Sequence, residues 1–365
     1  MPVQTLRLEG PQVGELYITA TPAAGPVDRQ AEEVFTGIAE ALRGSGGRII
    51  EERVFFIPGA AEAILSARSS AYGDLADGVG PSLLNASACT GDAIAGVQVH
   101  AVVGADPQPI KLNGAACGRV IRSGDSTFLA ALGLSCPQAG SPADQARAML
   151  EKAEEVTKLA GGSMLSVVRT WMWLGDILAW YDDFNRVRTE FFRERGLMNP
   201  SSGHHLPAST GIGVAPADGS ACGMDLVAVI GPNDAKELLL AGGEQGSAFD
   251  YGSAFSRASR MKALAHSIVY VSGTAAIDPD GHTECVGDAK CQIANTIAHV
   301  RAVMAEMGCG DGDVVQAGVY CKTAEVQRAF LEEWRDLPWP QVVMIADVCR
   351  EDLLFEAEVT ARSPQ

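Results

Sequence analysis

The sequence predicts an α+β protein made of three tandem copies of one helix–turn–strand module, arranged as a pseudo-trimer. Two segments match without a gap, because the same spacing separates a helix-leading Gln from a Gly and from a Val pair. A third segment repeats the pattern with a shorter turn. Recurring sequence of this kind indicates recurring structure, and binding sites are then expected between copies. The matching positions are Gln292, Gly308 and Val314; Gln145, Gly161 and Val167; and Gln30 and Ile49.

The last copy has the clearest secondary-structure pattern. Residues 267–273 are a β-branched and aromatic run closed by glycine, which predicts a strand. Residues 292–307 carry apolar residues at helical spacing, and the glycines that follow end the helix. The full prediction is a strand at 267–273, a helix at 292–307, a strand at 314–322, a helix at 323–335 and strands at 342–348 and 353–361.

The other two copies are predicted by the same pattern. In the first copy, strands are expected at 15–21, 48–57 and 96–103, and helices at 28–42 and 60–72. In the middle copy, strands are expected at 126–134, 165–174, 211–215 and 224–230, and helices at 144–159 and 180–195. The module boundaries then fall at 1–110, 111–240 and 241–365, with an exposed Gly-rich linker at 231–253.

Composition limits the classes of function. Apolar residues make up 47% of the chain and charged residues 20%, which is ordinary for a globular protein. The net charge of -17 argues against a nucleic-acid partner or an anionic membrane surface. A small anionic substrate is still possible, because a few arginines can make one pocket locally positive. The chain has no long apolar run and no signal-peptide pattern at its start, so we expect a cytoplasmic protein whose nine cysteines are reduced.

Several stretches resemble known families. The segment YVSGTAAID, the Gln-led helix, the turn before DVVQAGVY and the terminal LLFEAEVTA resemble the YjgF/RidA fold (a chorismate mutase-like fold), whose single modules trimerise around ligand pockets at their interfaces. The chain as a whole is more similar to the chorismatases, which are built on that fold. This similarity rests on VVRTWMWLGDILAWYDDFNRVRTEFF, LPASTGIGV, SAFSRAS and DVCREDLLFEAEV, and it is weaker in the first 110 residues.

The resemblance to the simple RidA proteins is incomplete. Their imine hydrolases carry an Arg after the Pro-Ala of the penultimate strand. The corresponding places here are Ser209 and Gln341, so imine hydrolysis is not expected. The resemblance to chorismatases implies instead a cofactor-free enzyme that cleaves the enol ether of chorismate and releases pyruvate. A non-catalytic RidA-like small-molecule binder is the alternative from another class of protein.

The candidate acid is Glu356. In the last strand, alternation places Glu356 and Glu358 on one face, which from the pattern alone could be a solvated acidic face. The resemblance implies that Glu356 is the chorismatase acid. It would protonate the terminal methylene carbon of the enol ether, and carbon accepts protons poorly, so the acid needs a raised pKa. Burial on a strand face would raise the pKa of a glutamic acid.

Arginines are the expected partners of the two substrate carboxylates. Arg257 is the first candidate, by resemblance, and Arg169 is the second. For each, an ion pair between modules is the alternative. In the middle module, Thr210 and Gly211 lie in a segment that offers hydroxyl and backbone donors and close approach to a ligand.

Two residues bear on the product. By resemblance, a cysteine at Cys349 accompanies intramolecular chemistry, in which a ring hydroxyl attacks, pyruvate leaves and an arene-oxide-like intermediate opens to 3-hydroxybenzoate. The thiol could exclude water, or act as a thiolate if its pKa were lowered. Ala258 indicates the opposite outcome, because by resemblance an alanine at this position accompanies the hydrolytic members of the family. They give trans-3,4-dihydroxycyclohexa-1,5-diene carboxylate, the dihydrodiol.

No cofactor or metal is expected. His204 and His205 are adjacent, which does not suit one metal, and no third ligand is spaced near them. The expected partner is the small molecule chorismate. A chain that is already a pseudo-trimer has less need to oligomerise, so we expect a monomer.

Overall fold

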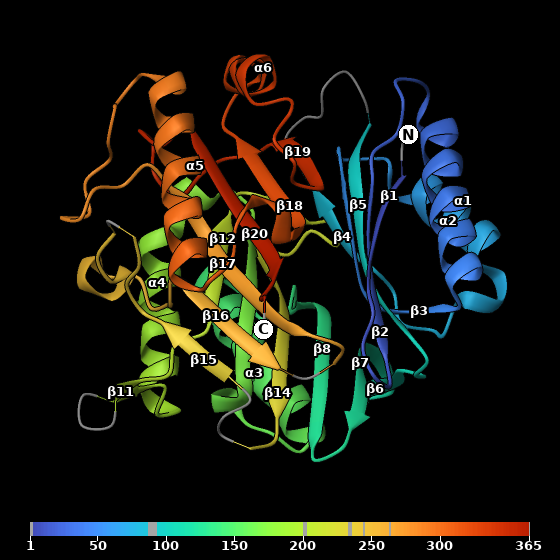
Figure 1. The fold of residues 1–365 in the computed structure, drawn as a ribbon. Helices are drawn as coiled ribbons and strands as arrows, with labels where there is room; N and C mark the ends of the chain where they lie inside the picture. The colour runs from blue at the N-terminus through green and yellow to red at the C-terminus, as the bar shows by residue number, and fades with distance from the viewer. Residues whose placement is uncertain are drawn as a thin grey trace.

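The computed structural model describes residues 3–86, 93–199, 203–232, 236–243, 245–262 and 264–364. It contains three mixed six-stranded sheets that meet at the centre, with the long helices outside them (Figure 1). This arrangement confirms the predicted α+β fold and the pseudo-trimer of modules.

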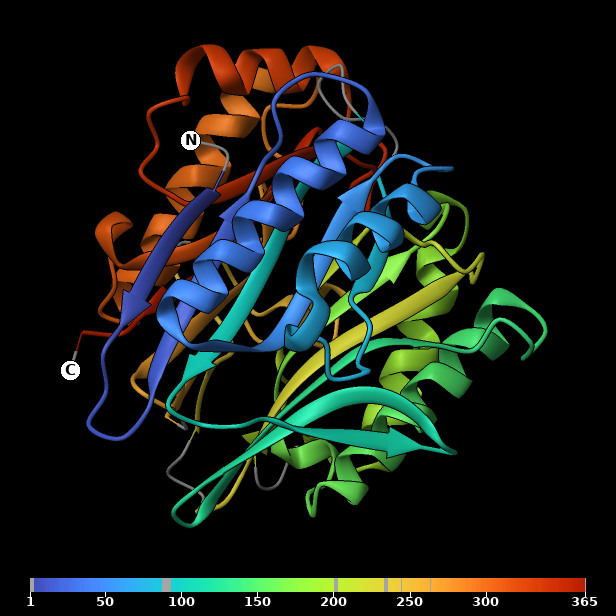
Figure 2. The same cartoon turned by 90° about the vertical axis from the view of Figure 1, so that its right-hand side faces the viewer.

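The first sheet is ordered β1-β2-β5-β3-β4, and a short strand from the second module, β13, adds to its edge. Its helices lie on the outer face, with α1 along the sheet and α2 beside α1 (Figure 2). The pair β3–β4 is parallel and the others are antiparallel. The bounds are β1 Val3–Leu8, β2 Gly14–Ala20, α1 Val27–Ser45, β3 Gly47–Phe56, α2 Ala61–Tyr72, β4 Ser82–Asn85 and β5 Ile94–Val103.

The second sheet is ordered β12-β9-β14-β8-β7-β6, with α3 packed on β8 and β14. Here β12 and β9 form the parallel pair. The bounds are β6 Gln108–Leu112, β7 Ala115–Ser123, β8 Ser126–Ser135, α3 Pro142–Leu159, β9 Val167–Leu174, α4 Ile177–Glu194, β12 Ala208–Ile212, β13 Ala215–Pro216 and β14 Cys222–Ile230, with a separate two-stranded pair β10 Met198–Asn199 and β11 Gly203–His204.

The third sheet is ordered β15-β16-β17-β20-β18-β19, with α5 packed on β17 and β20. Its parallel pair is β18–β19. The bounds are β15 Lys236–Leu239, β16 Ala258–Lys262, β17 Ser267–Ala275, α5 Ala289–Glu306, β18 Val314–Cys321, α6 Ala324–Glu333, β19 Gln341–Ile345 and β20 Phe355–Arg362.

The repeated Gln has a structural role in each copy. Its side-chain oxygen accepts backbone N–H groups at the start of the long central strand of its own sheet, and so ties the helix to that strand. Gln292 accepts from Leu354 at 2.8 Å, Gln145 from Ala221 at 2.9 Å, and Gln30 from Ile94 at 3.2 Å. All three Gln side chains are buried, where a hydrogen bond left unmade would be costly.

The two faces of each sheet pack against different parts of the protein. One face of each sheet packs on its helices, and the other contributes to a shared apolar core that contains residues of all three modules, among them Phe55, Trp171 and Tyr320. On β20, Phe355 and Ala357 face the helices, whereas Glu356 and Glu358 belong to the face turned to the other modules. The interpretation of this acidic face as solvated is therefore wrong, since both carboxylates are buried.

The modules contact one another in a cyclic order. Arg53 on β3 donates to Asp225 on β14 at 2.8 Å, and Arg169 on β9 donates to Glu358 on β20. Gln316 on β18 closes the ring by donating to the carbonyl of Val99 on β5 at 3.1 Å. A polar side chain from the same strand of each module thus reaches the central strand of the next module, as a pseudo-threefold arrangement requires.

Two expectations need correction. The segment 231–253 is not a simple exposed linker, because it contains β15 and because the buried Gln245 donates to the carbonyls of Ala275 and Ile277. Positions 233–235 and 244 lie outside the described residues. The cysteines are also not all free, since Cys285 and Cys291 form a disulfide at the start of α5.

Candidate active site

A cavity of about 160 Å³ lies between the second and third modules. Cavities of about 150 Å³ admit a six-membered ring. The second module supplies residues from α4 and β12, and the third module supplies residues from β17, β20 and the segments before them. The lining residues are Tyr181, Asp182, Asn185, Arg188, Ser209, Gly211, Ser253, Phe255, Arg257, Gly273, Ala275, Ile277, Cys349, Arg350 and Glu356.

Glu356 is the acid of this cavity. It lies on β20 opposite Tyr320 on one side and Ala275 on the other, and its side chain is 4% exposed. Burial, followed by the nearby charge of Glu358, raises the pKa of Glu356 to about 8. At neutral pH the group is therefore mostly a protonated carboxylic acid that can donate a proton.

Gly273 makes room for this acid. A Cβ atom built on Gly273 would collide with the carboxylate of Glu356. A larger residue on β17 would have to displace the acid from the cavity. Sequence analysis did not select this residue, although it lies in the quoted motif YVSGTAAID.

The side chain of Glu358 accepts hydrogen bonds from four donors. Oε1 accepts from Trp171 Nε1 at 2.9 Å and from the Tyr320 hydroxyl at 3.0 Å, and Oε2 accepts from Arg169 and Thr210. The two carboxyl groups on this face of β20 thus have different environments: Glu358 is surrounded by hydrogen-bond donors, whereas Glu356 is buried in the cavity wall.

Arg169 and Thr210 are brought to Glu358. Arg169 is 1% exposed, and its guanidinium also donates to the Thr210 hydroxyl at 2.6 Å. The Thr210 hydroxyl in turn accepts from the backbone N–H of Gly273 at 2.9 Å. Neither Arg169 nor Thr210 is among the residues that line the cavity. Their predicted contact with substrate stays a prediction, and the geometry favours a role in positioning Glu358.

Three arginines line the cavity among the described residues. Arg257 is buried and donates through Nε and Nη2 to the carbonyl of Gly246, both at 3.1 Å. Arg188 is also buried and donates to Asn185 at 2.7 Å, and Arg350 donates to the carbonyl of Gly281 at 2.7 Å. This local positive charge exists in a chain whose net charge is -17, and it suits a ligand with more than one carboxylate.

Sequence analysis missed Arg188, Arg350 and Tyr181. Tyr181, Asn185 and Arg188 occur at i, i+4 and i+7 of α4, so they share one face of that helix. That spacing was visible in the sequence, but only a structure places this face over the acid of another module. Burial raises the pKa of Tyr181 above its ordinary value, so its hydroxyl stays protonated at neutral pH.

Cys349 lines the same cavity as Glu356 and is a free thiol. Burial, followed by the effect of Glu356, raises its pKa to about 12. A thiolate with a lowered pKa, which sequence analysis considered, is therefore excluded near neutral pH. A protonated thiol can still fill space and exclude water.

Of the two remaining predicted residues, Gly211 lines the cavity and Ala258 does not. Gly211 lines the cavity, and a Cβ atom there would lie 3.5 Å from the Tyr181 hydroxyl, in ordinary contact. Ala258 is buried on β16, next to Arg257 in the chain and opposite Val271 of β17. It is not among the lining residues of the cavity.

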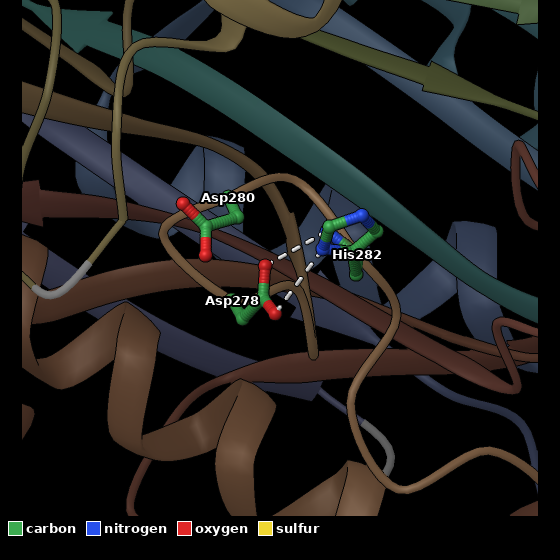
Figure 3. Close-up of side chains that lie close together, drawn as sticks. All are labelled: Asp278, Asp280 and His282. Carbon is green, nitrogen blue, oxygen red and sulfur yellow. Dashed lines mark hydrogen bonds and ion pairs between the residues drawn. The ribbon is translucent and has the colours of Figure 1, made fainter.

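Asp278, Asp280 and His282 gather on a loop after β17 (Figure 3). Asp280 and His282 are exposed, and the backbone N–H of His282 donates to Asp278 at 2.8 Å. Exposed acidic groups commonly lie this close without holding a metal, so we assign no role to the group.

The third module is similar to a family of known proteins. The family model described as Endoribonuclease L-PSP matches residues 247–363, which include the third sheet from β16 to β20. Two single-module structures, YEO7 of yeast and the Rid protein YyfA of Yersinia pestis, each cover 35% of this chain and 99% of their own, with identities of 13% and 20% and TM-scores of 0.30 and 0.29. No curated protein matches the chain.

One match spans the whole arrangement. The crystal structure of a chorismatase covers 98% of this chain and 100% of its own, with 17% identity and a TM-score of 0.64. The chain therefore has the fold of that chorismatase structure, and the predicted resemblance is confirmed at the level of the fold. Among the described residues, no helix combines the length and apolar character needed to span a membrane.

Proposed function

We propose that this chain is a chorismatase that converts chorismate to pyruvate and 3-hydroxybenzoate. The observation that carries the proposal is a buried glutamic acid with a pKa of about 8 in a cavity lined by three arginines. Chorismate needs both features, because its two carboxylates require cations and its enol ether requires a strong proton donor.

The residues take separate roles in this reaction. Arg257, Arg188 and Arg350 hold the carboxylates, and Glu356 delivers its proton to the terminal methylene carbon. The ether carbon then becomes an oxocarbenium ion and the enolpyruvyl group leaves as pyruvate. The neighbouring ring hydroxyl attacks the ring carbon that bears the ether oxygen, and the bond between that carbon and the ether oxygen breaks, so that this oxygen becomes the ketone oxygen of pyruvate. The proton of the hydroxyl returns to the Glu356 carboxylate, and the arene-oxide-like product isomerises to 3-hydroxybenzoate. The atoms of chorismate therefore equal those of pyruvate plus 3-hydroxybenzoate, and no water is consumed.

The test is turnover of pure chorismate, followed by a pyruvate assay and an NMR spectrum of the products. We expect equal amounts of pyruvate and 3-hydroxybenzoate. Stoichiometric pyruvate with the dihydrodiol would establish the hydrolytic alternative, which Ala258 favours. Binding of chorismate without pyruvate release would establish the non-catalytic binder. The monomeric state and the cytoplasmic location also stay predictions.

Arg257→Ala is expected to act on binding. It removes a charge-assisted contact worth about 1.5–3 kcal/mol, so KM should rise by one to two orders of magnitude with a smaller change in kcat. Arg260→Ala is the matched control, because Arg260 is three residues away, donates to Glu237 and does not line the cavity. An unchanged KM for the Arg257 variant would make this arginine a purely structural contact.

Cys349→Ala is expected to shift products from 3-hydroxybenzoate toward the dihydrodiol. The protonated intermediate can be captured by the ring hydroxyl or by water, and the internal route gains from proximity when water is excluded. Removing the sulfur admits water, while pyruvate release should fall less because protonation precedes the branch. Chromatography of the products measures the ratio. Cys321→Ala, a buried thiol elsewhere in the third module, should leave it unchanged.

A further inference from the structure

A second cavity, of about 280 Å³, lies between the first and second modules. Strand β4 of the first module and strands β8 and β14 of the second module line it. In the candidate active site the corresponding elements are β12, β17 and β20. The second cavity therefore occupies the pseudo-equivalent position at the preceding module interface.

Next to each of the two cavities, an arginine and a hydroxyl group hold a buried carboxylate. Asp225 on β14 accepts from Arg53 at 2.8 Å and from the Ser82 hydroxyl at 2.6 Å. Glu358 on β20 is held in the same way by an arginine and by the hydroxyl of Thr210. In both interfaces an arginine and a hydroxyl of one module hold a buried carboxylate of the next, which fixes the wall of the cavity.

Among the described residues, the lining of the second cavity has no counterpart of Glu356 or of the three arginines in the candidate active site. Gly223, opposite Trp173, takes the register position that Glu356 has opposite Tyr320. Among the described residues, no arginine, lysine or histidine lines this cavity. Its walls are mostly apolar, from Trp173, Leu84 and Pro216, with two serines beside them. Its charged member is Asp218, which accepts from the Ser135 hydroxyl at 2.6 Å. The site therefore has no acid at the catalytic position and no cation for a carboxylate.

The cavity is not a general consequence of the fold. At the third interface the matching position is Gly96, opposite Phe55, and a Cβ atom there would lie 2.7 Å from Cγ2 of Val342. Val342 of the third module thus packs directly against this position. A side chain of the next module fills this position at the third interface. At Gly223 a Cβ atom would lie 2.9 Å from Cγ of Pro216, so the proline ring covers that position and the cavity lies beside it.

We propose that this second cavity binds a small neutral phenol without turning it over. The volume is ample for a six-membered ring, given that about 150 Å³ admits benzene. The Trp173 ring and the aliphatic walls suit an aromatic face. The carboxylate of Asp218 accepts hydrogen bonds, so it favours a hydroxyl donor and repels an anionic ligand.

The test uses the whole chain labelled with 5-fluorotryptophan. Five tryptophans give five fluorine signals, and Trp173→Phe identifies the signal of interest. Phenol should shift the Trp173 signal saturably and leave those of Trp334 and Trp339 in place. Sodium benzoate, which has the same ring with a negative charge, should not shift the Trp173 signal.

Two filling variants make the test specific. Ala217→Phe and Ala61→Phe each place a ring in the cavity from a half-buried position on its wall. Each should weaken the phenol effect at least about tenfold, and two variants guard against one that fails to fold. A Trp173 signal that does not move, that moves equally with benzoate, or that still moves in a folded filling variant would overturn the proposal. The readout is independent of chorismate turnover.

Discussion

Glu356→Gln is expected to lower kcat for pyruvate release by about 10² to 10⁴ while leaving the affinity for chorismate nearly unchanged. Gln preserves the shape of the side chain, so the cavity and its arginines stay in place. It cannot deliver the proton that starts the reaction. Pre-steady-state binding and a pyruvate assay measure the two effects separately, and a variant that releases pyruvate at the normal rate would remove Glu356 from the mechanism.

The pH dependence follows from the same group. A general acid acts only when protonated, so kcat should be high below the pKa of about 8 and fall as the pH rises through it. The charge of Glu358 is the second cause of this raised pKa. Glu358→Gln should therefore move the midpoint of the pH profile to lower pH. A profile that is flat from pH 6 to 10 would contradict the assignment.

Arg169→Met is expected to destabilise the folded chain by about 3–5 kcal/mol, because it leaves a buried carboxylate without its ion-pair partner. Arg169 and Glu358 are both buried and belong to different modules. Chemical denaturation measures the loss. The double variant Arg169→Met with Glu358→Gln removes both charges and should recover most of the stability.

The same variants separate two roles for Arg169. If its side chain holds Glu358, the single substitution costs stability and the double variant restores it. If it clamps a substrate carboxylate, as the sequence resemblance implies, KM rises in both variants and stability changes little. The contacts that Arg169 makes with Glu358 and Thr210 favour the first result.

The repeated part of the fold was predictable because each module keeps one helix and one strand at fixed spacing. The predicted helix at 144–159 is α3, Pro142–Leu159, and the predicted strand at 267–273 is β17, Ser267–Ala275. Several outer strands were missed, among them β1, β6, β7 and β15, whereas the edge strand β19 was predicted. The hairpin of β6 and β7 turns at Asn113 and Gly114, both with positive φ, so an available Asn-Gly signal was overlooked.

The candidate site was predictable only in part. Glu356, Cys349, Arg257 and Gly211 line one cavity, and these are the residues that family motifs or strand alternation can select. Arg188 and Tyr181 reach that cavity from the neighbouring module. No local pattern states which helix face lies over which strand of another module, because that contact depends on how the three sheets pack.

Because the three modules belong to one chain, their three interfaces can differ from one another in sequence. In a ring of three identical subunits, every substitution is made three times, so the interfaces must change together. In this chain a single substitution alters only one of the three interfaces. One interface keeps an acid at Glu356, the next has Gly223 with the Pro216 ring against it and a cavity beside it, and the third is filled by Val342 against Gly96. A ligand of the acidic site should accordingly bind with a stoichiometry of one per chain and without homotropic cooperativity.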